Sequence, residues 1–375
     1  MCLALIVSIY GFADELKVTG VAPTFKTDDP IGQMFIDDFN RELASAFGQT
    51  INELNGELNK NFAGLLNLDN LVQGFGTSSV FASHTATQRA YGGYKLLAVT
   101  LGSMVGLQLP GSPAEFLKEG FDFEALLNRK GGVTLGINPQ VWNIHVGFNT
   151  SFLLKDLYLG ARFGVMNLDG IKLNQDGTTL SFNNFTLGAT ANYQLMRSRS
   201  LVGLITWRGI NVGTGLTFQN TNLNITMPLD EIRQDIANVG GPFTDMELVM
   251  DPRVAINIKV NTFTVPVEVI TAIKIVFINI PFGLGFDIGF GTSELSAGMD
   301  ADINAVNSTS SNLLSQDKPG SLSIGIGKEM NPELFNFKLM TGIGFTLGPV
   351  LIDIPLTYYV LNNGFNIGMT VGVAF

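Results

Sequence analysis

Apolar and polar residues alternate with a period of two along most of the chain after about residue 90. In Asn143–Leu154, apolar residues such as Ile144, Val146 and Phe148 alternate with polar or small ones, and residues 335–347 repeat the pattern. Alternation of this kind predicts β-strands with one apolar and one polar face. The polar face carries mostly Gly, Asn, Ser and Thr. Such residues suit a crowded, partly hydrated barrel lumen better than the charged outer face of a soluble sandwich.

About thirteen such segments can be distinguished after Ala90, and bacterial single-chain barrels normally have an even number of strands. A split at Asn138-Pro139, or near Gly209, would give fourteen strands, and twelve is the alternative. We treat Arg253–Thr264 and Val265–Phe277 as separate strands, and a change of phase at Asn183-Asn184 predicts a β-bulge. The connection Met227–Asp251 contains a short stretch, 230–238, that is expected to be helical.

The last strand, Gly364–Phe375, alternates most regularly. Every odd position from Phe365 is apolar, every even position is small or polar, and the chain stops on Phe375. This resembles the C-terminal signal of bacterial outer-membrane barrels. The resemblance implies two partners: outer-membrane lipid, and the barrel assembly machinery, which would bind Phe365–Phe375. The expected fold is therefore an all-β, transmembrane antiparallel barrel of about fourteen strands in the bacterial outer membrane.

The N-terminal part differs from the rest. Met1–Ala13 is apolar and ends in a small-x-small sequence, which predicts a signal peptide, although no Lys or Arg precedes it. Residues 14–88 then form a helical hatch or plug segment, and residues 89–375 form the barrel. A long amphipathic helix should begin at Asp28-Asp29-Pro30. Four Phe residues on its apolar face are candidate contacts for a hydrophobic substrate, or else simply pack the helix against its neighbours: Phe35, Phe39, Phe47 and Phe62.

Composition narrows the function classes. The chain of 375 residues is 46% hydrophobic and only 14% charged, yet no window of about 18 uninterrupted apolar residues predicts a transmembrane helix. A net charge of −10 argues against nucleic acid as a partner. The single cysteine, Cys2, excludes an internal disulfide, and a lipoprotein anchor is a minor alternative because the apolar residues follow it.

Catalytic or metal-binding patterns are weak. No nucleophile or carboxylate can be assigned beside His84 or His145, so an enzyme is not expected. The calcium-loop-like 300–304 stretch and the phosphate-loop-like 325–328 stretch both lack required residues, and neither a metal nor a cofactor is expected. Five polar residues on the strands are candidates for the lumen wall: His145, Arg162, Lys259, Asp287 and Lys338.

A helical segment of about 75 residues ahead of a barrel of about fourteen strands resembles the layout of the long-chain fatty acid transporter (FadL-like) family. Gln88–Gly93 is also similar to a stretch of that family's hatch. The resemblance implies a plugged channel that carries hydrophobic small molecules such as fatty acids toward a lateral opening. The long continuous helix departs from the family's short ones, so no binding residue is carried over.

Three functions remain open at this stage. The first is a plugged channel for hydrophobic small molecules. The second is a general diffusion porin whose N-terminal helix projects into the periplasm. The third is a structural or adhesive surface protein that acts through its long connections.

Overall fold

A computed structural model describes residues 17–28, 30–62, 68–83, 94, 96–109, 136–150, 154–173, 177–235, 246–307 and 315–375. These residues form one antiparallel sheet of 14 strands, a two-stranded sheet and two helices. The predicted fold class is therefore confirmed, and the large sheet has the predicted 14 strands, although four of them lie outside the closed barrel. The expected signal peptide, Met1–Ala13, lies outside the described residues.

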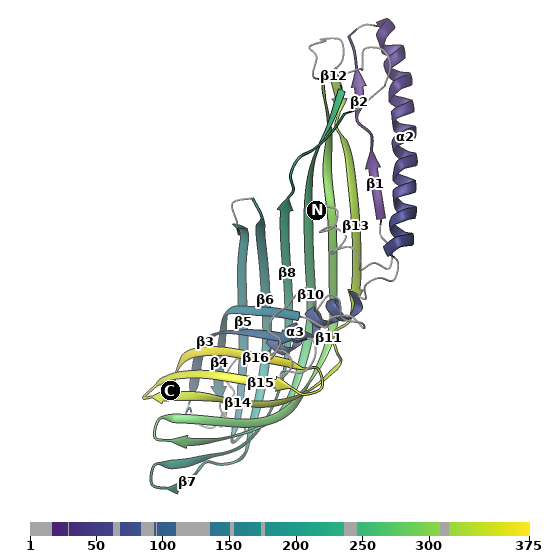
Figure 1. The fold of residues 1–375 in the computed structure, drawn as a ribbon. Coiled ribbons are helices and arrows are strands. Elements are labelled where there is room, and N and C mark those ends of the chain that lie inside the picture. Colours follow the sequence, from purple (N-terminus) through teal and green to yellow (C-terminus); the bar gives the residue numbers. More distant parts are fainter. Residues whose placement is uncertain are drawn as a thin grey trace.

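Ten of the strands pair in a closed circle and so form a barrel (Figure 1). In order around the circle they are β3 (Leu97–Gln108), β4 (Gly136–Asn149), β5 (Leu157–Lys172), β6 (Thr179–Met196), β8 (Ile205–Pro228), β10 (Met246–Ile275), β11 (Ile278–Asn307), β14 (Phe335–Leu347), β15 (Val350–Tyr359) and β16 (Gly364–Ala374). The last strand closes the circle, because β16 pairs with β3 along its whole length. The number of strands in the circle is even, as expected for a bacterial barrel.

The other four strands of the large sheet lie outside the circle: β1 (Lys17–Val21), β7 (Arg199–Val202), β9 (Ile232–Asp235) and β13 (Gly320–Met330). The small sheet contains β2 (Thr24–Lys26) and β12 (Ser315–Lys318). The helix expected at 230–238 is wrong over its described residues, because Ile232–Asp235 form β9, which pairs with Met250–Glu247 of β10. Residues 236–238 lie outside the described residues. A helix of nine residues is marginal in water, whereas a neighbouring strand satisfies the backbone donors of β9.

Two strands of 30 residues each, β10 and β11, run far beyond the barrel (Figure 1). Their pairing is continuous from Met246 with Asn307 to Ile275 with Ile278. The separate strands expected at 253–264 and 265–277 are therefore one strand, β10. The barrel continues upward as an open, curved sheet that we call the extension (Figure 1). It comprises the upper parts of β8, β10 and β11, above Phe218, Phe263 and Phe290, together with β13 and β1.

The polar and apolar faces of these strands exchange places partway along. In β11 the outward face is apolar over 282–290 and mostly polar over 292–302. The inward face carries polar residues, Gly and Pro281 over 279–289 and is apolar over 295–303. The neighbouring strands change between Val165 and Met166 in β5, between Phe182 and Phe185 in β6, between Phe218 and Leu223 in β8, and between Val260 and Phe263 in β10. The lower part thus faces lipid, and the upper part is built like a sheet in water.

This exchange explains two errors in the strand assignment. The bulge expected at Asn183-Asn184 is wrong, because β5 and β6 pair without interruption there. The barrel also does not split at Asn138-Pro139, which lies inside β4, and Gly209 lies inside β8. An extra residue and an exchange of environment produce the same change of apolar phase in a sequence, and only the pairing distinguishes them.

A row of aromatic rings marks the level of the exchange. Ring centroids of Phe163, Phe185, Phe218, Phe263 and Phe290 follow one another across β5, β6, β8, β10 and β11 at 4.9–6.2 Å. Exposed aromatic residues recur at the other end of the barrel: Phe148, Tyr193, Phe277 and Phe375. On β16, Phe365 and Phe375 are about 33 Å apart along the strand and roughly 24 Å apart along the normal at a 45° tilt. That height matches the apolar band of an outer membrane.

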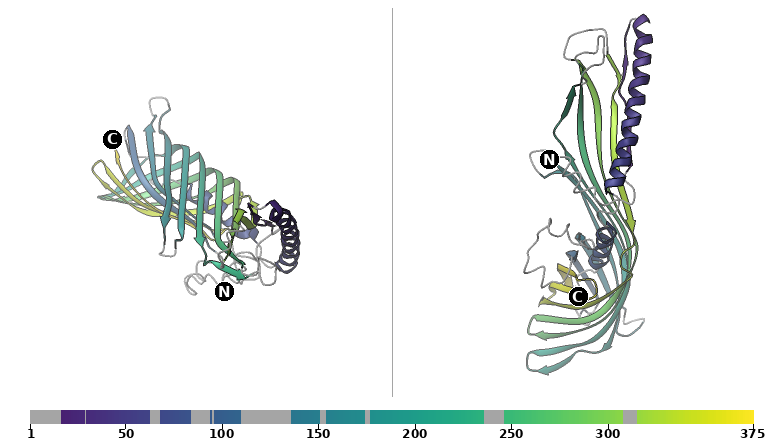
Figure 2. Two further views of the ribbon diagram at one scale, coloured as in Figure 1. Left: turned by 90° about the horizontal axis from the view of Figure 1, so that it is seen from above. Right: turned by 45° about the vertical axis from the view of Figure 1, so that its right-hand side comes forward.

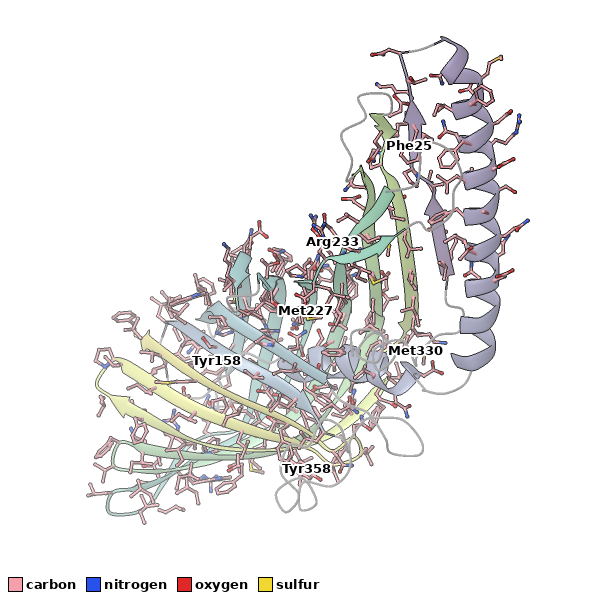
Figure 3. All side chains as sticks on the ribbon, turned by 45° about the horizontal axis from the view of Figure 1, so that its top comes forward. Phe25, Tyr158, Met227, Arg233, Met330 and Tyr358 are labelled. Carbon is pink, nitrogen blue, oxygen red and sulfur yellow. The ribbon has the colours of Figure 1, made fainter. Side chains whose placement is uncertain are left out.

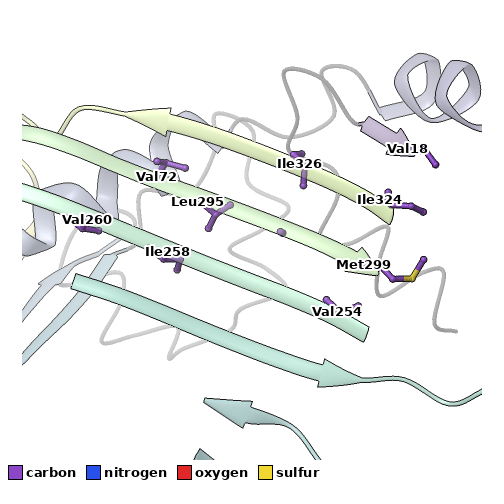
Figure 4. Close-up of a cluster of buried hydrophobic side chains, with 10 residues drawn as sticks. Val18, Val72, Val254, Ile258, Val260, Leu295, Met299, Ile324 and Ile326 are labelled. Atoms are coloured by element: carbon purple, nitrogen blue, oxygen red, sulfur yellow. The ribbon is translucent and has the colours of Figure 1, made fainter. Parts of the chain in front are cut away.

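The extension has its own hydrophobic core (Figure 4). Val254, Leu295 and Ile324, from three neighbouring strands, pack with Val18 of β1 and Val72 of the second helix. All of these side chains are buried. The upper sheet is therefore stabilised by burial of apolar surface on its inward face, as in a water-soluble domain.

The first helix, α2 (Pro30–Phe62), stands beside the extension and away from the barrel (Figures 1 and 2). It begins at Pro30 as predicted and runs without a break through Gly48 and Gly56. Asn55 accepts from the amide of Val18 and donates to its carbonyl at 2.7 and 2.8 Å. Asn40 bonds Phe25 of β2 in the same two-sided way. These amides attach α2 to β1 and β2 as an additional strand would.

The second helix, α3 (Leu68–Ala82), lies inside the curved wall (Figure 2). It contacts β3, β4, β10, β11, β13 and β16, and the side chains of residues 77–83 are almost fully buried. No described helix combines the length and the apolar character needed to cross a membrane. The helix that occupies the lumen is thus the short one, α3. The long helix α2, whose amphipathic pattern is the clearest in the sequence, lies beside the extension.

Candidate functional site: a plugged lumen beneath an apolar cavity

The C-terminal end of α3 is bound by donors from the barrel wall. The last carbonyls of a helix have no partner within the helix. Asn366 of β16 donates to the carbonyl of Phe81, and Arg162 of β5 donates to the carbonyl of Ser83. A guanidinium at this end also interacts favourably with the helix dipole. Tyr359 of β15 stacks on Phe81 with ring centroids 3.8 Å apart, so three strands fix the end of the plug.

Glycines in the wall make room for the plug. A Cβ on Gly136 would overlap the carbonyl of Gly74, and one on Gly106 would overlap the carbonyl of Ser78. A Cβ on Gly364 would overlap the Phe81 ring. Three strands therefore approach α3 closely enough that any side chain at these positions would push it away.

A charged cluster lies on the lumen wall next to Phe81. The Lys338 ammonium lies 2.5 Å from Glu268 and 2.6 Å from Asp287, and Lys338 is fully buried. Tyr359 donates to the second oxygen of Asp287 at 2.9 Å. Each charge thus has a partner, as buried ionic groups require. The cluster connects β10, β11, β14 and β15 on one side of the barrel.

The structure places four of the five polar candidates on the inward face. His145, Arg162, Asp287 and Lys338 are all at most 3% exposed. The Nε2 atom of His145 lies 3.4 Å from the hydroxyl of Thr190. Lys259 is the exception, because it is exposed on the outward face of the extension. The alternation was interpreted as if the inward face were polar throughout, and Lys259 lies beyond the level where the faces exchange.

The Phe residues of the long helix do not line the lumen. Phe35 is 69% exposed, and Phe39 packs on Phe25 with ring centroids 5.6 Å apart. Phe47 lies against Gly20 of β1. The side chain of Phe62 lies outside the described residues. The contacts of Phe39 and Phe47 are those of the packing alternative.

A layer of side-chain amides crosses the lumen between β4 and β8, which are not neighbours in the wall. Gln140 donates to Gln219 at 2.5 Å, and Gln219 donates to Asn138 at 2.5 Å. Asn138 and Asn184 both donate to the hydroxyl of Thr221. These buried groups satisfy one another, and together with α3 they close the barrel.

An apolar cavity of about 290 Å³ lies against this amide layer. It is lined by Phe75 of α3, Ile137, Asn138 and Pro139 of β4, Met166 and Leu168 of β5, Leu180 and Phe182 of β6, Thr221 and Leu223 of β8, and Ile258 and Val260 of β10. Its two polar residues, Asn138 and Thr221, are bonded to each other at 3.1 Å. The cavity therefore offers apolar surface and no charged group among its lining residues.

The wall beside the cavity lacks pairing between the described parts of β4 and β5, and this unpaired stretch is called the opening below. β4 and β5 pair only from Asn143 with Gly164 to Asn149 with Tyr158. Above this point residues 136–140 of β4 pair with β3, and residues 165–168 and 171–172 of β5 pair with β6, but the two strands do not pair with each other. Pro139 lacks an amide donor and Trp142 has a φ of 61°, and both features interrupt regular pairing. The cavity residues Ile137, Pro139, Met166 and Leu168 come from the two separated segments.

Sequence reasoning missed α3 and therefore the cavity. Residues 67–87 showed no clear period, because a helix enclosed on all sides needs no polar stripe. A usable signal was present on the strands, where glycines such as Gly106 and Gly136 occupy inward positions. A single sequence does not reveal that these glycines face one helix.

The closed circle of strands, the apolar outward band between aromatic rows and the polar plugged lumen define a bacterial outer-membrane β-barrel protein. The expected class and location are thus confirmed, and a helix from the N-terminal part of the chain, α3, lies inside the barrel. More specifically, the chain belongs to the Lsa36-like family, whose model matches residues 22–375. No curated protein matches the sequence.

Several solved structures share features of the fold. The translocator domain of autotransporter NalP from Neisseria meningitidis is 10% identical, with a TM-score of 0.32 over 76% of this chain and 90% of that one. The CymD monoaromatic hydrocarbon channel is 9% identical, with a TM-score of 0.25 over 82% and 98%. The P. putida toluene transporter TodX is 8% identical, with a TM-score of 0.24 over 79% and 99%. Because these sequence identities and TM-scores are low, the function must be argued from the site itself.

Proposed function

We propose that the protein is an outer-membrane channel for neutral hydrophobic small molecules, which bind in the apolar cavity and leave sideways between β4 and β5. The observation that carries this proposal is the position of the cavity, between a closed lumen and an opening in the wall. A cavity of 290 Å³ is at the lower end of the usual size for small-molecule sites.

A straight path down the lumen is unfavourable for an apolar molecule. The floor of the cavity is the amide layer, and below it lie the paired charges of Lys338, Glu268 and Asp287. Displacing these groups would leave buried donors and charges without partners, at a cost of about 1–3 kcal/mol for each neutral group and more for each charge. The opening beside Pro139 and Met166 begins at the level of the aromatic row, where the exposed Ile137 and Trp142 of β4 keep the outward surface apolar. An apolar molecule that leaves here would meet the upper edge of the lipid, where it is more stable than in water.

The lining favours neutral molecules over fatty acids. None of the residues around the cavity is Lys, Arg or His. A carboxylate bound there would lose its hydration without gaining a cation, which is strongly unfavourable. A hydrocarbon or a simple aromatic compound has no such group.

The test is competition for a fluorescent hydrophobic probe, N-phenyl-1-naphthylamine, bound to the purified protein in detergent. Toluene should displace the probe at lower concentrations than decanoate does. Leu223→Trp, which adds volume inside the cavity, should weaken probe binding at least about tenfold, which corresponds to about 1.4 kcal/mol. The matched control is Leu216→Trp on the outward face of the same strand. Equal binding by both variants would overturn the cavity assignment, and stronger competition by decanoate would overturn neutrality.

A surface-binding role is the second candidate. It is favoured by the extension, whose outward face carries polar residues such as Glu294 and Ser296 well beyond the aromatic row. Figure 3 shows Met227 and Arg233 on this upper part, and Tyr158 and Tyr358 on the barrel below it. The two roles use different parts of the chain. A substitution in the cavity should therefore affect only transport, and a substitution on the extension should affect only binding to a surface partner.

A further inference from the structure

The two ends of the barrel have different connections. At the Phe375 end, two residues, Val276 and Phe277, join β10 to β11, and Gly348 and Pro349 join β14 to β15. At the opposite end, residues 109–135 join β3 to β4, and residues 308–314 lie between β11 and β12. Outer-membrane barrels have short periplasmic turns and longer extracellular loops. The Phe375 end is thus assigned to the periplasm, and the extension to the outside.

The chain passes through its own barrel. α3 lies in the lumen and ends at its C-terminal side against Arg162 and Asn366. Tyr94 then contacts the lower wall, where its carbonyl accepts from Asn149 at 3.3 Å and its ring lies 5.1 Å from that of Tyr158. Leu96 donates to the carbonyl of Phe375 at 2.8 Å. The path therefore leads from the extension end to the Phe375 end before β3 begins.

Everything described before α3 lies at the extension end. β1 pairs with β13 in the register of Lys17 with Gly325, and β2 pairs with β12. α2 contacts β1 and β2. Lys26 also forms an ion pair with Asp317 at 3.2 Å. We call residues 17–62 the N-terminal module.

From this path we infer that the N-terminal module is displayed on the outer surface of the cell, joined to the barrel by a chain segment that runs through the lumen. The alternatives considered from the sequence placed this segment in the lumen or the periplasm. The inference rests on the described points on either side of the wall: the module at the extension end, α3 in the lumen, and Tyr94 and Leu96 at the Phe375 end. An N-terminal module presented in this way is available to partners outside the cell while the C-terminal strand ends at the periplasmic face.

Cysteine accessibility on whole cells tests the inference. In a Cys2→Ser background, three single variants are compared: Glu42→Cys on α2, Lys172→Cys at the upper end of β5, and Lys155→Cys in the turn between β4 and β5. All three positions are exposed. The label is a polyethylene-glycol maleimide too large to pass through porins. Glu42→Cys and Lys172→Cys should react on intact cells, and Lys155→Cys only after the outer membrane is permeabilised.

Each other pattern is informative. If Glu42→Cys reacts only under the conditions that expose Lys155→Cys, the path through the lumen is wrong and the inference fails. If Lys155→Cys alone reacts on intact cells, the path is right but the orientation is reversed, and surface display is also overturned. The inference does not rest on transport, so loss of probe binding leaves it unaffected.

Discussion

Gln140 and Gln219 meet across the lumen although their strands are separated in the wall by β5 and β6. The Gln140 amide donates to the Gln219 carbonyl at 2.5 Å, and both side chains are fully buried. A contact between strands that are not neighbours means that the barrel is filled at this level rather than hollow. It also separates the apolar cavity from the polar lumen below.

Replacing both partners of this contact should cost less than the two single replacements added together. Gln219→Leu leaves the Gln140 donor and the Asn138 acceptor unpaired, and Gln140→Leu leaves the Gln219 acceptor and the Asn143 donor unpaired, so each should destabilise the protein by about 1–3 kcal/mol. In the double variant only Asn138 and Asn143 lose a partner, so its loss should be smaller than the sum of the two single losses. Urea unfolding in detergent measures both. Additive losses in the double variant would show that the two amides are independent.

Enlarging a glycine under the plug should open the channel to ions. Gly136→Val places a side chain where the carbonyl of Gly74 lies, so α3 should be displaced. Planar-bilayer recordings should then show a steady conductance several times that of the unmodified protein, which is expected to be nearly closed. Gly325→Val is the matched control, because nothing lies within 4 Å of a Cβ there. A large conductance in the unmodified protein would favour the porin alternative.

Removing the buried Lys338 should strongly lower the stability of the protein. Lys338→Met leaves Glu268 and Asp287 close together without a cation, which should cost about 3–5 kcal/mol. The temperature at which the folded form is lost on unboiled gels should fall accordingly. Glu268→Gln keeps the pair of Lys338 and Asp287 and should be much milder. Equal effects of the two substitutions would contradict this account of the cluster.

The level of the aromatic row predicts where charge is tolerated. Leu284→Arg and Ser296→Arg both change outward, exposed positions of β11. The first lies in the lipid-facing part and should cost about 2–4 kcal/mol near the midplane, whereas the second lies above the row and should be nearly neutral. Refolding into vesicles at graded urea concentrations measures the difference. Similar costs at both positions would refute the assigned boundary.

Closing the wall should block release of a bound molecule. A thiol cross-linker joining Ile137→Cys to Leu168→Cys, in a Cys2→Ser background, would span the separated parts of β4 and β5. Transfer of toluene into vesicles should fall several-fold after cross-linking, while each single variant treated alike should remain active. Undiminished transfer would mean that the exit lies elsewhere.

The sequence predicted the class well because alternation and the terminal Phe375 are local signals. It also located the start of α2 at Pro30 and four inward polar residues. It could not show where the two faces exchange, so Lys259 was placed inside and β10 was divided. It also gave α2 the role that belongs to α3. Which helix enters a barrel depends on wall glycines distant in the sequence, and that information appears only when the strands are paired.

The exchange of faces has a consequence for how deep the protein sits. Moving β10 and β11 toward the periplasm by two residues would bring Asn261 and Thr292, which lie above Phe263 and Phe290, into hydrocarbon. Moving them outward by the same amount would lift those rings into water. Either shift would raise the free energy on five strands at once, so the aromatic row sets the depth of the barrel in the membrane. It fixes the vertical position of the barrel, and with it the height at which the opening between β4 and β5 meets the lipid.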